Sequence, residues 1–179
     1  MRTIEIRALP ISLELARQHL RVSDANNDNE LIVAKTEMAV GIAEDMTGRI
    51  IREKVVQFDV LIPAASSPIV CLPVHTMSIE QLSVSHASLP EEDYTFLPGD
   101  YDSMLITNPR YAGQHLTVRA VVGYNCENIP PAIKAAILLI LGTLYDNESD
   151  NIVGRSVSEL SLTAENLLSP WRVSPYREE

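Results

Sequence analysis

The chain has 179 residues, and 46% of them are hydrophobic, which is enough for a folded core and too apolar for a disordered chain. Its 14 Lys and Arg are outnumbered by 24 Asp and Glu, which gives a formal net charge of -10. Because a protein that grips nucleic acid through its phosphates needs clustered cations, this charge argues against that mode of binding. The length allows one domain, with or without a sizeable insertion.

Two helices are predicted near the N-terminus. Ser12 can cap the first, whose apolar residues recur at helical spacing as far as Val22. After an Asn- and Asp-rich turn, Asp28 can cap a longer helix that runs to about Thr47. Gly48 follows at the position where a glycine commonly ends a helix. The pattern predicts an αα-hairpin.

Between residues 50 and 124 the apolar residues recur at the period of a strand. The clearest alternating runs cover residues 56–62 and 116–122, and weaker extended runs surround residues 69–72, 79–84, 94–97 and 104–106. Turn signals rich in Pro and Gly separate these runs. The region is therefore predicted to be a small antiparallel sheet inserted between helices.

A third helix is predicted to start at Pro130 and Pro131 and to run to Tyr145, apolar on nearly every side. Such a helix must be buried all round, and a small helical domain cannot easily surround one of its own helices. We therefore expect part of its surface to meet the inserted sheet or another subunit. The inter-subunit candidates are Ile133, Ile137, Leu138 and Leu141. A last short helix is expected over residues 161–168.

Together these elements predict an α+β, mainly α fold. It is a small helical bundle, formed by the N-terminal αα-hairpin plus two C-terminal helices, with an inserted small antiparallel β-sheet. The predicted domains are a helical domain of residues 1–49 and 129–169, an inserted β subdomain of residues 50–128, and a C-terminal tail of residues 170–179.

No membrane partner is expected. Residues 1–7 contain no continuous apolar run, so they do not form a signal peptide. The apolar segment from Ile129 to Tyr145 is interrupted by Pro130, Lys134 and Gly142, and it is short for a membrane span. A soluble protein made in the cytoplasm is the expectation.

The sequence contains no recognisable catalytic, cofactor-binding or metal-binding constellation. The four histidines are isolated, and the seven glycines form no GxSxG, GxGxxG or P-loop motif. Acidic clusters that begin at Asp24, Asp100 and Asp146 depart from the ligand pattern of a calcium loop. The run from Glu91 to Asp93 is expected to be a soluble loop tip. We expect no enzyme and no cofactor; a metal-dependent hydrolase that uses the acidic loops is a remote alternative.

Without a catalytic, cofactor or metal site, the remaining candidates for function are surfaces that bind other proteins. Trp and Arg are enriched at the residues that dominate binding energies, and the chain places Trp171 beside Arg172 near its end. Packing of Trp171 back onto its own helices is an equally good interpretation of that residue.

Four blocks of sequence follow one another at characteristic spacing. They are Ser12-Leu13, Ala16 and His19-Leu20-Arg21-Val22 with Leu31-Ile32; Ala43-Glu44 with Thr47-Gly48-Arg49; Gly123-Tyr124, Ile129-Pro130-Pro131-Ala132-Ile133-Lys134 and Ala136-Ile137-Leu138-Leu139 with Tyr145-x-Asn147-Glu148; and Glu159-Leu160 with Leu167-Leu168-x-Pro170-Trp171-Arg172-Val173. In this order the chain resembles the head–tail connector (adaptor, or head-completion) proteins of long-tailed phages, prophages and gene transfer agents. The likeness covers nearly the whole chain.

The resemblance implies a non-enzymatic, structural virion protein that is made in the host cytoplasm and resides in the neck, at the head–tail interface. Such proteins form a ring of identical copies, usually a dodecamer, beneath the portal protein. The ring extends the DNA channel and offers a docking surface to a downstream stopper or tail protein. Double-stranded DNA would pass without specific binding, which an acidic surface suits because a basic lining would hold the phosphates.

The C-terminal segment of the family reaches toward the portal. Carried over to this chain, that segment gives the portal-docking candidates Leu167, Leu168, Trp171, Arg172 and Val173. A different neck component, such as a stopper or tail-terminator subunit, is the alternative, and it would bind the adaptor or the tail tube in place of the portal.

Overall fold

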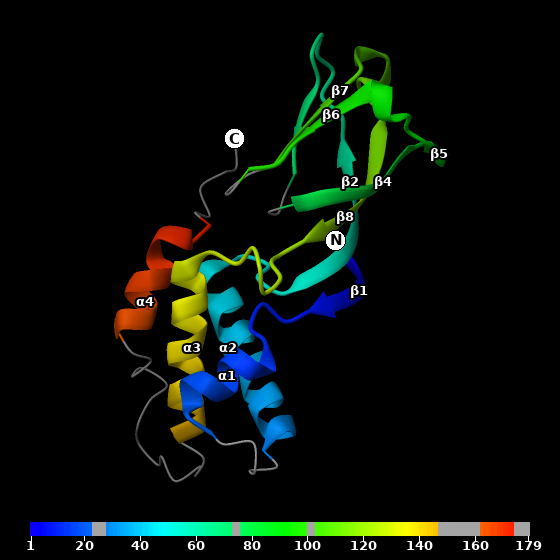
Figure 1. Ribbon diagram of the computed structural model, residues 1–179. Coiled ribbons are helices and arrows are strands. Elements are labelled where there is room, and N and C mark those ends of the chain that lie inside the picture. The colour runs from blue at the N-terminus through cyan, green and yellow to red at the C-terminus, as the bar shows by residue number, and fades with distance from the viewer. Residues whose placement is uncertain (23–27, 73–75, 100–102, 147–161, 174–179) are drawn as a thin grey trace. The chain divides into compact units, whose positions relative to one another are not determined.

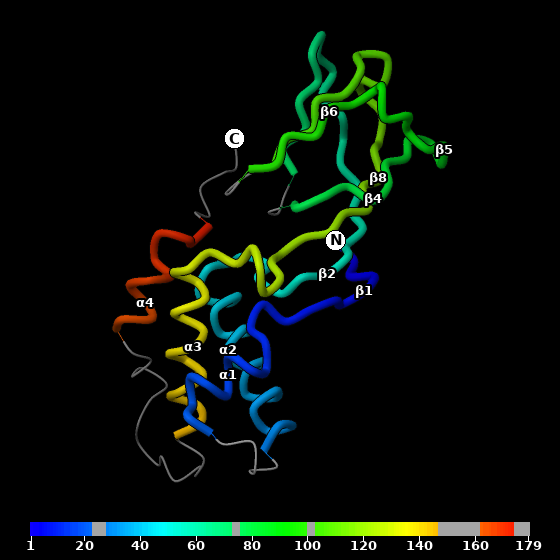
Figure 2. Tube along the Cα trace, in the orientation of Figure 1, coloured from blue at the N-terminus to red at the C-terminus, as the bar shows by residue number. Residues whose placement is uncertain are grey.

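The computed structural model describes residues 1–22, 28–72, 76–99, 103–146 and 162–173 (Figure 1). The chain divides into two compact units. The β unit contains Met1–Ala8 and Arg52–Gly123, and the helical unit contains Leu9–Ile51 and Tyr124–Glu179. The chain therefore passes from one unit to the other after Ala8, after Ile51 and after Gly123, a path that the tube in Figure 2 traces.

The larger sheet of the β unit has five antiparallel strands in the order β1-β2-β8-β4-β5. Their bounds are β1 Arg2–Ala8, β2 Glu53–Leu61, β4 Thr76–Val84, β5 Ala87–Ser88 and β8 His115–Val122. The central strand β8 places Val118 opposite Phe58 of β2 and Leu82 of β4. All three side chains are buried, so this cross-strand row forms part of the apolar face of the sheet.

The smaller sheet has three strands in the order β3-β7-β6, with β3 at Ile69–Cys71, β6 at Tyr94–Leu97 and β7 at Met104–Thr107. Val70 and Leu105 lie opposite each other on its buried face. Two short 3-10 turns, η1 at Glu91–Asp93 and η2 at Pro109–Tyr111, flank β6 and β7 in the sequence. The predicted extended runs are confirmed as strands.

The expectation of a mainly α fold is wrong. Among the described residues, 40% are helical and 33% lie in strands, and the strands form two antiparallel sheets in place of one small sheet. One cause is β1, an edge strand assigned to no element from the sequence, which pairs with β2 about fifty residues later. Pairing between distant segments supplies the backbone hydrogen bonds of a strand even where the local apolar period is weak.

The helical unit contains four α-helices in its described residues. They are α1 Leu13–Leu20, α2 Asn29–Thr47, α3 Pro131–Asp146 and α4 Leu162–Leu168, and the 3-10 turn η4 Ser169–Trp171 follows α4 directly. The Ser12 hydroxyl accepts a hydrogen bond from the Leu15 N–H at 3.2 Å, and Gly48 ends α2 at a φ of 66°. Both helices predicted near the N-terminus are confirmed, and the turn predicted between them lies largely outside the described residues. Asp28 precedes α2 but makes no side-chain capping bond to it.

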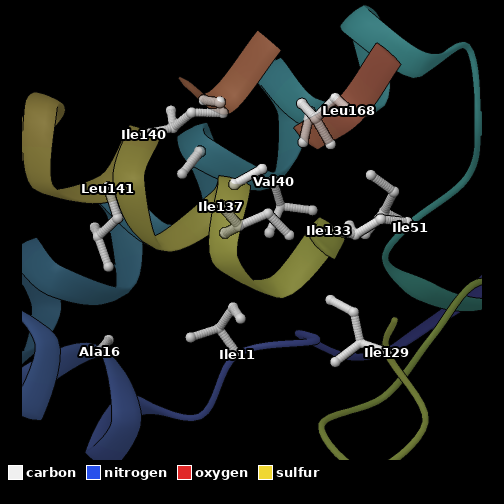
Figure 3. Packing of buried hydrophobic residues seen from close by; sticks show 14 of the residues in the cluster. Ile11, Ala16, Val40, Ile51, Ile129, Ile133, Ile137, Ile140, Leu141 and Leu168 are labelled. Atoms are coloured by element: carbon white, nitrogen blue, oxygen red, sulfur yellow. The ribbon is translucent and has the colours of Figure 1, made fainter. Parts of the chain in front are cut away.

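Helix α3 is the centre of this unit and packs against α1, α2 and α4. Figure 3 shows Ile133, Ile137, Ile140 and Leu141 of α3 within the same cluster as Leu168 of α4. Fully burying an aliphatic side chain of this size contributes about 1.5–3 kcal/mol, so this helix is a main source of the unit's stability. Three helices of the same chain thus cover most of the apolar surface of α3.

None of the helices in the described part of the chain is both long enough and apolar enough to cross a membrane.

Candidate interaction site

The C-terminal segment, defined here as residues 162–173, consists of α4, η4 and the two residues that follow. Ala164 and Leu168 of α4 are fully buried in the core of the helical unit. Figure 3 shows Leu168 pointing into the same cluster as Ile133 and Ile137 of α3. Because α4 has only seven residues, packing and not intrinsic propensity must hold it in place.

The end of the C-terminal segment is tied to the turn that terminates α2. The Val173 N–H donates to the Thr47 carbonyl at 2.8 Å, and the Arg49 Nε–H donates to the Trp171 carbonyl at 2.5 Å. The last carbonyls of a helix have no partner within the helix, so the Val173 N–H satisfies one of them. The Val173 Cβ also lies 3.8 Å from where a Cβ on Gly48 would stand.

Thr47 gives this turn an internal brace. Its buried hydroxyl donates to the Ala43 carbonyl at 2.7 Å and accepts from the Arg49 N–H at 3.3 Å. The Glu44 carboxylate accepts from the Ile51 N–H at 2.7 Å and fixes the chain beyond the turn. Several internal hydrogen bonds therefore stabilise the turn after α2, to which residues 171–173 bind.

The five portal-docking candidates occupy different depths in the helical unit. Leu168 is fully buried, Leu167 and Trp171 are half-buried against the core, and Arg172 and Val173 are exposed. Trp171 thus packs partly onto its own helices, as the intrachain interpretation of this residue expects. Arg172 and Val173 are the members of the set whose side chains lie most open to a partner, and Val173 is 50% exposed.

The four inter-subunit candidates lie on α3. Ile133, Ile137 and Leu141 are each 0% exposed within the single chain, whereas Leu138 is half-buried and packs against the edge of the core. Contacts with α1, α2 and α4 account for the burial of the first three. Of this set, Leu138 keeps surface for a neighbouring molecule.

Two charged clusters of the β unit tie its own strands together. The Glu80 carboxylate of β4 accepts from the Arg119 Nε–H of β8 at 2.9 Å and from the Arg7 Nη2–H of β1 at 2.5 Å. The hydrogen bond from Arg119 is the largest cause of a lowered pKa at Glu80. Burial opposes it, and the hydrogen bond from Arg7 and the charges of both arginines lower the pKa further. Glu80 thus links β4 to β1 and β8. No local sequence pattern predicts this link, because the three residues are far apart in the chain.

The second cluster surrounds Asp93. Its carboxylate, only 6% exposed, accepts hydrogen bonds from the Tyr111 hydroxyl at 2.8 Å, from the Asn108 Nδ2 at 3.3 Å and from the Arg110 guanidinium. The expectation that residues 91–93 form a soluble loop tip is therefore wrong for Asp93, because a buried carboxylate needs hydrogen-bond donors and the η2 turn with its N-cap Asn108 supplies them. The cluster joins η1 to η2.

The acidic clusters considered as calcium loops fall largely on residues 23–27, 100–102 and 147–161, which lie outside the described residues. Within the residues that the structure does describe, no group of three or more His, Cys, Asp or Glu side chains could hold a metal ion.

No protein-family model matches the chain, and no curated protein matches it either. Solved structures do match its fold. A chain in the neck of an empty gene transfer agent (GTA) particle, computed with C6 symmetry, aligns with a TM-score of 0.68 at 15% identity, over 97% of this chain and 96% of that one. The alignment therefore shows a shared fold along nearly the whole length of both chains.

Two further solved structures match the same fold. A chain in the virion of the native gene transfer agent particle aligns with a TM-score of 0.69 at 14% identity, and one in the neck of the native particle, computed with C12 symmetry, aligns at 0.66 and 15% identity. Each alignment covers 97% of this chain and 96% of the other. At this coverage the alignments extend over both units.

Proposed function

We propose that this chain is a structural, non-enzymatic subunit of the neck of a phage-like particle. The observation that carries the proposal is the fold shared over 97% of the chain with chains of gene transfer agent necks and virions. A likeness that covers 97% of the chain is far more specific than one limited to a small helical bundle. The step from shared fold to shared role is an analogy, and it needs an independent test.

Within the neck, the proposed role is that of the head–tail connector, or adaptor. In this role copies of the chain form a ring beneath the portal protein, extend the DNA channel and offer a docking surface to the next neck or tail protein. The C-terminal segment supports the portal contact, because it combines buried anchors with exposed ends. Leu168 holds α4 in the core, while Arg172 and Val173 project from a turn that Thr47 and Arg49 brace.

The roles of the candidate residues follow from their burial. Leu168 acts as an intrachain anchor that positions the segment, and Leu167 and Trp171 contribute their remaining exposed surface. Arg172 supplies a cation that can donate to a carboxylate or to backbone carbonyls of the portal. Val173 supplies apolar contact. Trp171 and Arg172 are of the residue types that most often dominate interface energies.

The negative charge of the chain is compatible with a channel through which DNA passes without binding. A formal net charge of -10 on each copy, repeated around a ring, repels phosphates and disfavours a bound state. Double-stranded DNA is therefore proposed as transient cargo of the channel and not as a ligand.

The test is binding to purified portal rings, measured as the mass of the complex by light scattering. We expect the wild-type chain to bind, and Val173→Glu to lose binding because it buries an unpaired charge in the contact. Leu162→Glu is the matched control, since Leu162 belongs to the same segment and is 77% exposed but is not a docking candidate.

Each outcome has a distinct meaning. Binding to the portal that Val173→Glu removes and Leu162→Glu retains supports the adaptor role. Binding to an adaptor ring or to tail tubes, with no affinity for the portal, rejects that role and favours a stopper or tail terminator. A chain that binds none of these assemblies contradicts a place in the neck.

A further inference from the structure

Helix α2 presents a continuous apolar stripe on the side opposite its buried face. Its inner face is formed by residues that are at most 2% exposed: Ile32, Thr36, Ala39, Val40, Ala43 and Thr47. Leu31, Ala34, Met38 and Gly41 recur at intervals of three or four residues, so they share the outer face. Leu31 is 40% and Met38 57% exposed, so the described part of the chain leaves much of these two large apolar side chains open.

Gly41 gives a second, independent observation on the same stripe. It lies in the middle of a 19-residue helix, and a Cβ added to it would meet nothing within 4 Å. Neither a positive φ nor a close intrachain neighbour therefore requires glycine there. Glycine destabilises a helix interior relative to alanine, and its usual benefit is the close approach of another backbone. The described residues place no such backbone within 4 Å of that position, so a second molecule is the natural source.

The charges around the stripe indicate what that molecule carries. Exposed Glu30 and Asp45 lie on the outer side of α2 near its two ends. An exposed cationic residue is found on another helix of the same unit, where Arg21 caps the end of α1. A second copy of the chain can thus offer a surface of opposite charge to the acidic margins of the stripe.

The symmetry of a ring favours this arrangement. In a closed ring of identical subunits, each copy contributes two different surfaces, and one surface of each copy meets the other surface of the next. Like surfaces would meet in a two-fold dimer, and there the acidic margins would repel each other.

We propose that the outer face of α2, centred on Met38 and Gly41, is the lateral contact surface for a second copy of this chain, with the cationic end of α1 of that copy against its acidic margin. This proposal rests on the proposed ring-forming function and assigns the surface through which the ring closes. Gly41 lets the neighbouring backbone approach, and Leu31 and Met38 fill the apolar contact.

The test compares two substitutions of the same kind. Met38→Glu places a carboxylate in the centre of the stripe, and Leu61→Glu does so on an equally open apolar residue of β2, which is 59% exposed. Self-association is followed by light scattering, alone and on portal rings, together with images of the particles formed. We expect Met38→Glu to raise the concentration for half-maximal association by about tenfold or more, and Leu61→Glu to leave it unchanged.

Gly41→Ala separates assembly from folding. Because alanine is the better helix former and has free space, it should raise the melting temperature of the dissociated chain by roughly 1–4 °C. It should nevertheless weaken self-association several-fold, since its methyl group stands where the next backbone approaches. A variant that merely misfolds cannot give this combination.

A charge exchange tests the cationic partner surface. Asp45→Arg should weaken association, and adding Arg21→Asp in the same chain should restore part of the loss.

The same measurements distinguish an error about the α2 surface from an error about the proposed ring. If Met38→Glu and Gly41→Ala assemble like the wild type, α2 is not the lateral surface, even where rings form on the portal. If the wild-type chain never self-associates, alone or on portal rings, both the surface and the proposed ring are overturned.

Discussion

Gly123, which follows β8 at the passage from the β unit to the helical unit, should tolerate no side chain. Its φ is +84°, and a Cβ would lie 2.3 Å from the Arg52 carbonyl oxygen, 2.7 Å from the Arg52 carbonyl carbon and 3.1 Å from the Glu53 nitrogen. The left-handed conformation costs an alanine about 1–2 kcal/mol, and displacing backbone to relieve overpacking costs about 1–3 kcal/mol more. We therefore expect Gly123→Ala to lower the free energy of unfolding by about 2–5 kcal/mol.

Gly113→Ala is the matched control for Gly123→Ala. Gly113 has a similar φ of +75°, but a Cβ there would meet nothing within 4 Å, so only the conformational cost applies. Part of that cost is offset because alanine reduces the entropy of the unfolded chain. Urea unfolding followed by circular dichroism measures both variants. Equal losses of stability for Gly113→Ala and Gly123→Ala would refute the argument that the approach of Arg52 requires glycine.

Three further substitutions test other parts of the structure. Leu168→Ala should lower the free energy of unfolding by about 2–5 kcal/mol in urea titrations, since the side chain is fully buried; a loss below 1 kcal/mol would place α4 outside the core. Lys35→Met should cost about 1–2 kcal/mol, because the Lys35 ammonium donates to the Leu144 carbonyl at the end of α3 at 2.8 Å, and an unchanged melting temperature would count against that contact. For Glu80, the lowered pKa means that its bond to Arg119 stabilises the fold above the pKa of the unfolded chain and is lost as the pH falls through the lower folded pKa. The difference in melting temperature between wild type and Glu80→Gln should therefore be largest near neutral pH and vanish in acid; a difference that grows on acidification would reverse the sign of this account.

The helices were predictable because the signals that delimit them are local. Ser12 caps α1 and Gly48 ends α2 through contacts within four residues of each, so the sequence pattern contains the necessary information. Pro131 marks the start of α3 for the same reason. The predicted bounds consequently fall within one or two residues of the observed ones.

The extent of β structure was not predictable to the same degree. β1 alternates Ile4 and Ile6 with charged residues, but both faces of this edge strand are largely exposed, so no core side distinguishes it from a loop. Its strand conformation depends on hydrogen bonds to β2, and nothing within the seven residues indicates that partner. Sheet content was therefore underestimated where pairing is long-range.

The candidate site was predictable only in outline. The resemblance selected residues 167–173, but it could not separate the buried anchor Leu168 from the exposed Arg172 and Val173. The bond between Val173 and Thr47 joins residues more than 120 positions apart, so no local pattern contains it. Likewise, the apolar surface of α3 indicated a need for cover, and the structure supplies most of that cover from α1, α2 and α4.

A density map of the neck of the particle that contains this chain, at a resolution that traces side chains, tests the central claim most directly. The account predicts repeated copies of the chain in a ring directly beneath the portal, with Arg172 and Val173 against portal residues. A ring found further toward the tail, or particles whose neck lacks the chain, would contradict it.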